Sequence, residues 1–146
     1  MKILVINGPN LNMLGKRNPA IYGSGTYDDL CTLIKSFGDE RGMTVEFFQS
    51  NSEGDIISRI QKCLFDETEG LIINAGAYTH YSYAIRDALE MLEIPKIEVH
   101  ISDVDAREDF RKISVIRDVC TCCIKNEGFD GYVHALKILE ESEKNS

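Results

Sequence analysis

The segment KILVI at residues 2–6 runs directly into NGPNLNMLGKRNPAIYG at residues 7–23. The first part is a short run of apolar and β-branched residues, which is typical of a buried strand. The second part is a long irregular loop, and loops of this kind carry function more often than packing. The chain therefore begins with a buried strand that leads into a loop with polar groups near its start.

Apolar runs of similar length recur along the chain and alternate with longer amphipathic segments. The expected strands are 2–6, 44–50, 70–74, 96–100 and 119–124, and the expected helices are 27–41, 55–65, 82–92, 105–110 and 131–139. This alternation predicts an α/β protein with a parallel sheet covered on both faces. Five strands in this rhythm suit a flavodoxin-like doubly wound sheet of order 2-1-3-4-5.

Capping residues support two of these helices. Thr26 is placed to cap the helix that follows it, and Gly42 lies where the C-terminal cap of that helix is expected. Either Asn51 or Ser52 could cap the next helix.

The length and composition fit a single α/β domain, residues 1–146, with residues 140–146 expected to form a frayed tail. A formal net charge of -8 argues against nucleic acid as a partner, although a positive pocket for a small anion is compatible with it. No apolar run approaches the roughly 20 residues of a membrane helix, and the N-terminus resembles a strand, so we expect a cytoplasmic protein without membrane contact. The five cysteines are expected to be reduced thiols packed as small apolar residues.

The predicted strand order locates a site before any motif is considered. In such sheets ligands bind outside the carboxyl ends of the strands, near the switch point. The exits of strands 1, 3 and 4 would be neighbours there, and they carry NGPNLN (7–12), NAGAYTHYS (74–82) and EVHIS (98–102).

The third exit offers Asn74, Gly76, His80 and Ser82. Free backbone N–H groups, with Ser82 as the helix cap, can form a binding site for an anion or for hydroxyl groups. The alternative is a capped turn with a solvated histidine.

The fourth exit places Glu98, His100 and Ser102 on one face of a strand, because side chains alternate along it. Glu98 can hold the His100 imidazole in one tautomer and prepare it as a general acid. The alternative is a structural Glu–His pair at the end of the sheet.

Arg107 and Arg111 follow at helical i, i+4 spacing and could face the same opening. There, either arginine could bind a carboxylate or hydroxyl group. For one of them, a surface salt bridge with Asp109 or Glu108 is an equally good explanation.

The first loop also contains Arg17 and Tyr22. A tyrosine with the ordinary pKa of about 10 becomes a base near pH 7 only where its phenolate is stabilised by roughly 4 kcal/mol, and an arginine can supply this. A base of this kind, paired with a histidine acid, can remove a proton next to a carbonyl and expel a hydroxyl group elsewhere. The alternative is that Tyr22 merely anchors the loop.

Several other sites are disfavoured by residue type. A phosphoacceptor site needs Asp where this chain has Asn7 and Asn74. The first loop is too bulky for a phosphate cradle, and a phosphate at the helix start GSGT (23–26) remains a minor alternative. With three histidines and no ligand-spaced cluster, no metal site is predicted.

Taken together, GPNLNMLGKR, IYG, NAGAYTHYS, EVHIS and REDFR resemble the type II 3-dehydroquinate dehydratase family, through nearly the whole chain to GFDGYVHAL at residues 128–136. The resemblance implies a cofactor-free enzyme of the shikimate pathway that dehydrates 3-dehydroquinate through an enolate. It implies that the loop 15–25 closes as a lid, and that the assembly is a homododecamer, a tetramer of trimers.

The resemblance also assigns roles to individual residues. The base would be Tyr22 activated by Arg17, the acid His100 supported by Glu98, and Asn10 would hold a water molecule against the enolate. The implied substrate contacts are Asn74, His80, Ile101, Ser102 and Arg111, together with Asp87 reaching the site of a neighbouring subunit.

Two residues near the expected site depart from the family pattern. Asn18 stands where the family usually has Glu, and Asp103 stands where it usually has Asn. Asp103 adds negative charge beside the expected binding site for the substrate carboxylate. It would weaken substrate binding unless it pairs with Arg107. Two alternatives stay open at this point: an anion-binding sensor that has lost turnover, and a lysine Schiff-base dehydratase of the unrelated type I kind.

Overall fold

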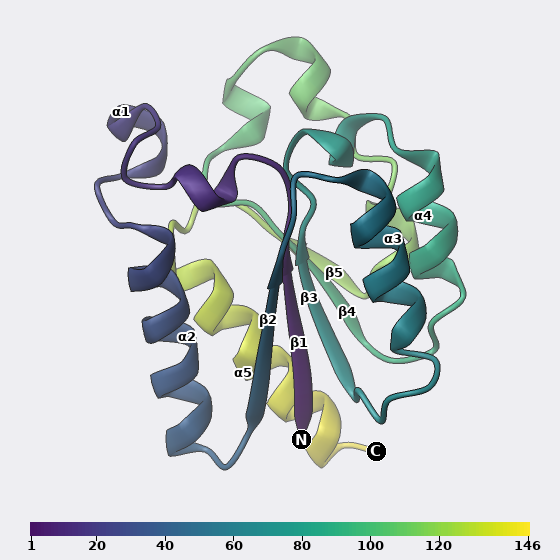
Figure 1. The fold of residues 1–146 in the computed structure, drawn as a ribbon. Helices are drawn as coiled ribbons and strands as arrows, with labels where there is room; N and C mark the ends of the chain where they lie inside the picture. Colours follow the sequence, from purple (N-terminus) through teal and green to yellow (C-terminus); the bar gives the residue numbers. More distant parts are fainter.

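Five parallel strands form one sheet with helices on both faces (Figure 1). The computed structural model describes residues 1–146. The strand order is β2-β1-β3-β4-β5, which confirms the predicted flavodoxin-like arrangement and places the switch point between β1 and β3. The strands are β1 Lys2–Asn7, β2 Thr44–Gln49, β3 Gly70–Asn74, β4 Lys96–Val99 and β5 Cys122–Ile124.

Two pairs of helices cover the sheet. On one face lie α2 (Tyr27–Glu40) and α5 (Asp130–Lys144), and on the other lie α3 (Glu53–Lys62) and α4 (Tyr83–Glu90) (Figure 1). Strand residues alternate between the two cores, so that in β1 Ile3 and Val5 pack against the first pair and Leu4 and Ile6 against the second. Both faces of the sheet are therefore buried, as a parallel sheet requires.

Short helices occupy the connections that follow β1, β3 and β4. The loop after β1 contains a 3-10 turn and the one-turn helix α1, the loop after β3 contains a 3-10 turn, and the connection between β4 and β5 contains three. Their bounds are η1 Leu11–Met13, α1 Pro19–Tyr22, η2 Gly76–His80, η3 Val104–Ala106, η4 Asp109–Lys112 and η5 Arg117–Val119.

The expected helix caps are present. The Thr26 hydroxyl accepts a hydrogen bond from the Asp29 backbone N–H at 3.1 Å, and the Asp29 carboxylate accepts one from the Thr26 N–H at 3.0 Å, which forms a capping box at the start of α2. Gly42 follows that helix with a φ of 72°, a conformation that favours glycine. Of the two candidates for α3, Ser52 is the cap.

The predicted helix over residues 105–110 is wrong. The segment forms the separate 3-10 turns η3 and η4, and Arg107 between them has an extended backbone. This segment is mostly exposed and has no apolar stripe to pack against the sheet, and short helices are not stable in water without such packing. The following strand is also shorter than predicted and begins at Cys122.

The last helix is longer than predicted. It continues to Lys144, so most of the segment expected to be frayed is helical. Leu139 is fully buried against the sheet, and Glu140 forms an ion pair with Arg41 at 3.6 Å, so the helix gains tertiary contacts beyond its expected end.

The five cysteines are free thiols; Cys63 is buried and the other four are half-buried. No helix combines the length and apolar character needed to cross a membrane.

We expect Thr26→Ala to lower the free energy of unfolding by about 1 kcal/mol, because the N-terminal cap of α2 is lost. Urea denaturation measures the difference. Thr32→Ala is the matched control, since Thr32 lies exposed in the middle of the same helix, where alanine is the better helix former. Equal losses in the two variants would contradict a capping role.

Candidate active site

A cavity opens at the carboxyl ends of β1, β3 and β4, where the strand order predicted a site. About 540 Å³ of space lies inside it, open solvent at its mouth included. Nine of the eleven predicted site residues line it: Asn10, Arg17, Tyr22, Asn74, His80, His100, Ile101, Ser102 and Arg111. Arg107, which the sequence analysis named only as a possible ligand-binding residue, lines it as well.

The Tyr22 phenol meets two arginines. The Arg107 Nη1 donates a hydrogen bond to the phenol oxygen at 2.7 Å, and the Arg17 guanidinium lies over the ring at 3.9 Å from its centroid. A hydrogen bond donated by a cation stabilises a phenolate more than a phenol. Direct contact with the phenol oxygen thus comes from Arg107, while Arg17 acts through the face of the ring.

Local structure explains how the first loop presents this phenol. Tyr22 ends the one-turn helix α1, and the Asn18 side chain caps that helix by accepting a hydrogen bond from the Ala20 N–H at 3.1 Å. The departure at Asn18 therefore has a structural role next to the phenol. Gly25 permits the loop to approach α5, because a Cβ there would lie 2.6 Å from the Phe129 ring.

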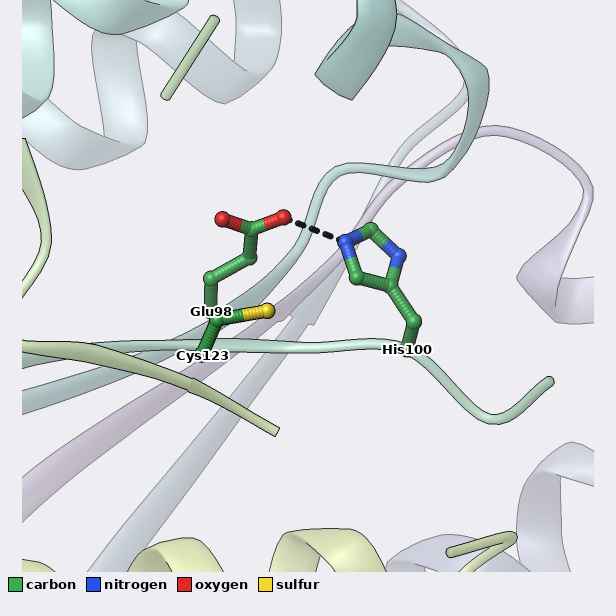
Figure 2. Close-up of side chains that lie close together, drawn as sticks. All are labelled: Glu98, His100 and Cys123. Carbon is green, nitrogen blue, oxygen red and sulfur yellow. Dashed lines mark hydrogen bonds and ion pairs between the residues drawn. The ribbon is translucent and has the colours of Figure 1, made fainter. Parts of the chain in front are cut away.

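His100 and Glu98 form the second chemical group of the site. The His100 Nε2 lies 2.5 Å from Glu98 Oε2, and both residues are buried (Figure 2). Burial raises the pKa of Glu98, but the hydrogen bond and charge of His100, together with the charge of Arg117, outweigh it and hold that pKa below its usual value. Since Nε2 faces the carboxylate, Nδ1 is the ring nitrogen left for a ligand.

Figure 2 also shows Cys123 beside this pair, where its thiol, the Glu98 carboxylate and the His100 ring offer ligand atoms within 4.8 Å of one another. The sequence analysis found no such cluster, because Cys123 reaches it from the neighbouring strand, where it is the register partner of Glu98. The carboxylate and Nε2 already bond each other, and Arg117 contacts both carboxylate oxygens. A cation would have to displace these partners, which disfavours a metal site at this cluster.

Asn74 is held by a buried relay that the sequence analysis missed. Its amide donates to the Tyr132 hydroxyl at 3.0 Å, and that hydroxyl donates to Asn7 Oδ1 at 2.6 Å. The Asn74 Oδ1 accepts the Gly76 N–H at 3.1 Å, which fixes the amide orientation. The second Asn74 N–H is left to face the cavity.

His80 and Arg111 lie across the cavity from the phenol loop, on elements that follow β3 and β4. The His80 Nδ1 lies 2.7 Å from the Ile113 carbonyl, and burial is the main cause that lowers the His80 pKa. Arg111 forms an ion pair with Glu108, as one of the sequence alternatives suggested, and still lines the cavity.

Two acidic residues lie outside this arrangement. Asp87 is exposed on α4 and does not line the cavity of its own chain. Asp103 forms no ion pair, so the pairing with Arg107 considered from the sequence does not occur.

The charge of the cavity is opposite to that of the whole protein. Arg17, Arg107 and Arg111 line it, and no carboxylate does. A chain with a net charge of -8 therefore contains a positive pocket suited to a small anion.

The fold and this cavity define a flavodoxin-like α/β protein with a positive pocket that is lined by a tyrosine and two histidines. The family model "Dehydroquinase class II" matches residues 1–140, and the chain belongs to that family. A 3-dehydroquinate dehydratase of Thermotoga neapolitana is 54% identical, over 99% of this chain and 100% of the relative. One of Lachnoclostridium phytofermentans is 57% identical, over 93% of this chain and 94% of the relative.

Solved structures agree with the family. The crystal structure of the type II dehydroquinase from Butyrivibrio crossotus matches with a TM-score of 0.95 at 53% identity, covering 96% of this chain and 97% of that one. The type II dehydroquinase from Propionibacterium acnes matches with a TM-score of 0.91 at 46% identity, covering 94% of each chain.

We expect Tyr132→Phe to lower the free energy of unfolding by about 1–3 kcal/mol, because the buried Asn7 and Asn74 side chains each lose a partner. Urea unfolding measures this loss. Tyr83→Phe is the control, since Tyr83 is exposed and its hydroxyl makes no hydrogen bond. Equal stability of the two variants would mean that the relay contributes nothing.

Proposed function

We propose that this chain removes water from 3-dehydroquinate to give 3-dehydroshikimate, without a cofactor, as a hydro-lyase of the shikimate pathway. One observation carries the proposal: a phenol bonded to an arginine and a carboxylate-bound imidazole face the same positive cavity. Family membership supplies the substrate class.

In the first step, the Tyr22 phenolate takes a proton from the carbon next to the substrate ketone, and the electron pair moves onto the ketone oxygen as an enolate. Arg107 at the phenol oxygen and Arg17 over the ring stabilise the phenolate before the transfer. Asn10 helps to hold a water molecule against the enolate. Its backbone is fixed because its N–H donates to Asn51 Oδ1 at 3.0 Å.

In the second step, the enolate electrons form the new carbon–carbon double bond and the tertiary hydroxyl leaves with a proton from His100 Nδ1. Nε2 stays bonded to Glu98 throughout, so the carboxylate stabilises the imidazolium before it acts. Acid and base contribute ~10² to 10⁴ each, and substrate positioning and enolate stabilisation supply the remainder.

The other lining residues hold the substrate. The Ile101 backbone and the Ser102 hydroxyl receive its carboxylate, beside the Arg107 guanidinium, which donates to Ser102 Oγ at 3.4 Å and keeps a buried Nε without a partner. Asn74, His80 and Arg111 contact its hydroxyl groups. The loop 15–25, which carries both Arg17 and Tyr22, closes over the substrate as a lid.

The assembly and the location of the enzyme belong to this proposal too. Asp87 is exposed on α4 and away from its own cavity, which is the placement needed to reach a neighbouring subunit's site in a homododecamer built as a tetramer of trimers. Analytical ultracentrifugation tests the assembly, and a monomer at working concentrations would contradict it. The cytoplasmic location expected from the sequence stays a prediction.

Two alternatives are tested by the same assay. An anion-binding sensor would bind 3-dehydroquinate without the rise in ultraviolet absorbance that the enone product gives. A type I Schiff-base enzyme needs a lysine in the cavity, and no lysine lines it. Borohydride trapping of substrate on the protein would nevertheless favour that mechanism over ours.

We expect Tyr22→Phe to abolish turnover and to leave substrate binding within about tenfold, because only the proton-accepting oxygen is lost. Enone absorbance measures turnover, and calorimetry measures binding. Tyr81→Phe is the control, since Tyr81 is exposed and outside the cavity. A kcat near that of the parent protein would overturn the assignment of the base.

We expect His100→Ala to stop after the first step, because Tyr22, Arg17 and Arg107 are intact. The substrate's α-proton should then exchange with deuterated solvent while little product forms, which NMR can follow. His134→Ala is the control, since His134 is half-exposed and pairs only with Glu127 on the surface. Absence of exchange in His100→Ala would contradict the two-step scheme.

A further inference from the structure

The Glu98 carboxylate has more partners than His100. The Ser114 hydroxyl donates to Oε1 at 3.1 Å, and Arg117 donates through Nε to Oε1 and through Nη2 to Oε2, both at 3.4 Å. Arg117 comes from η5 in the connection between β4 and β5, and it does not line the cavity. Any effect of Arg117 on the cavity must therefore pass through Glu98.

The burial of Glu98 makes a second cation necessary. The Glu98 side chain is fully buried, and a buried carboxylate is costly unless a charged partner compensates it. His100 supplies that charge only while it is protonated, and it gives its proton away in each catalytic cycle. Arg117 is charged in every state, so it compensates Glu98 when the imidazole is neutral.

The same contact decides where the proton between Glu98 and His100 resides. The carboxylate and the imidazole share one hydrogen bond, and its proton resides on the group that binds it more tightly. A guanidinium on both carboxylate oxygens favours the ionised carboxylate, so the proton stays on the ring.

The other titratable groups around the pair do not replace Arg117. Burial raises the pKa of Cys123 to about 11 and that of Cys120 to about 12, so both thiols are neutral near pH 7. His80 has a pKa held below its usual value, mainly by burial. Asp105 and Lys125 pair with each other.

We infer that Arg117 is a positioning residue for the general acid: through its two hydrogen bonds it keeps Glu98 ionised and aimed at His100 Nε2. The inference rests on the proposed role of His100 as the acid.

The test compares Arg117→Met, which removes the charge, with Arg117→Lys, which keeps it. For Arg117→Met we expect kcat to fall by about tenfold to 10²-fold, less than removal of the acid itself would cost. KM should stay within about twofold, because Arg117 does not touch the cavity. Arg117→Lys should recover most of kcat.

The pH profile gives a readout that a merely structural role would not change. Removing a positive charge beside the Glu98–His100 pair makes the pair bind protons more tightly. In a plot of kcat against pH, the Glu98–His100 pair sets the position of some of the limbs. These limbs should therefore move to higher pH in Arg117→Met and stay in place in Arg117→Lys.

Two further measurements distinguish a specific loss of the Arg117 contact from a general disturbance of the protein. Exchange of the substrate's α-proton should continue near the parent rate in Arg117→Met, because the Tyr22 step does not use Glu98, and this also shows that the variant is folded. Arg41→Met is the matched control, since Arg41 pairs with Glu140 of α5 and does not contact Glu98 or His100; it should keep the parent kcat.

Any one of three results would overturn the role of Arg117. The first is an unchanged kcat and pH profile in Arg117→Met, and the second is a loss of α-proton exchange in that variant equal to its loss of turnover. The third is a kcat in Arg117→Lys as low as in Arg117→Met. A fully active His100→Ala would instead overturn the proposed acid.

Discussion

The site depends on a carboxylate buried inside a parallel sheet. Glu98 lies in β4 with its side chain shielded from water, in a position where an apolar residue would be expected. Its charge is maintained only because His100, Ser114 and Arg117 converge on it. All three partners come from the connection between β4 and β5, His100 directly after the strand and Ser114 and Arg117 further along, so this irregular segment is as important to the site as the strand itself.

The proposed acid and the proposed base are held in different ways. His100 follows β4 directly, and its backbone N–H donates to the Ile124 carbonyl at 2.9 Å, so the sheet fixes its position. Tyr22 is on a one-turn helix in a long loop, where its half-buried ring packs against the core and its oxygen accepts a hydrogen bond from Arg107. No residue of the loop 15–25 is fully buried, so the proposed opening of this loop as a lid would cost little free energy.

Sequence reasoning succeeded where the determining interactions are local. The cap at Thr26 and the alternation of strand and helix are read from neighbouring residues, and the strand order follows from general rules of parallel sheets. It failed for residues 105–110, where charged residues at helical spacing have no core to pack on. The same segment carries Arg107, whose contact with the Tyr22 oxygen the sequence did not predict.

The contacts that were missed join parts of the chain far apart in sequence. Arg107 and Tyr22 are separated by 85 residues, and Tyr132 reaches Asn7 across 125. No periodicity or local motif encodes such a contact. The GFDGYVHAL segment was visible as part of a resemblance, yet only the folded chain shows its tyrosine between two asparagines at the switch point.

An acidic protein with an anionic substrate raises the question of which charges dominate. The net charge of -8 repels an anion in solution, but exposed charges act through water and are screened beyond about 8 Å at physiological salt. The three cavity arginines lie within contact distance of any ligand in the cavity, where less water intervenes and the interaction is stronger. Local attraction therefore outweighs distant repulsion once the substrate reaches the mouth. Since no carboxylate lines the cavity, Glu98 can serve the acid from behind His100 without repelling the substrate it helps to convert.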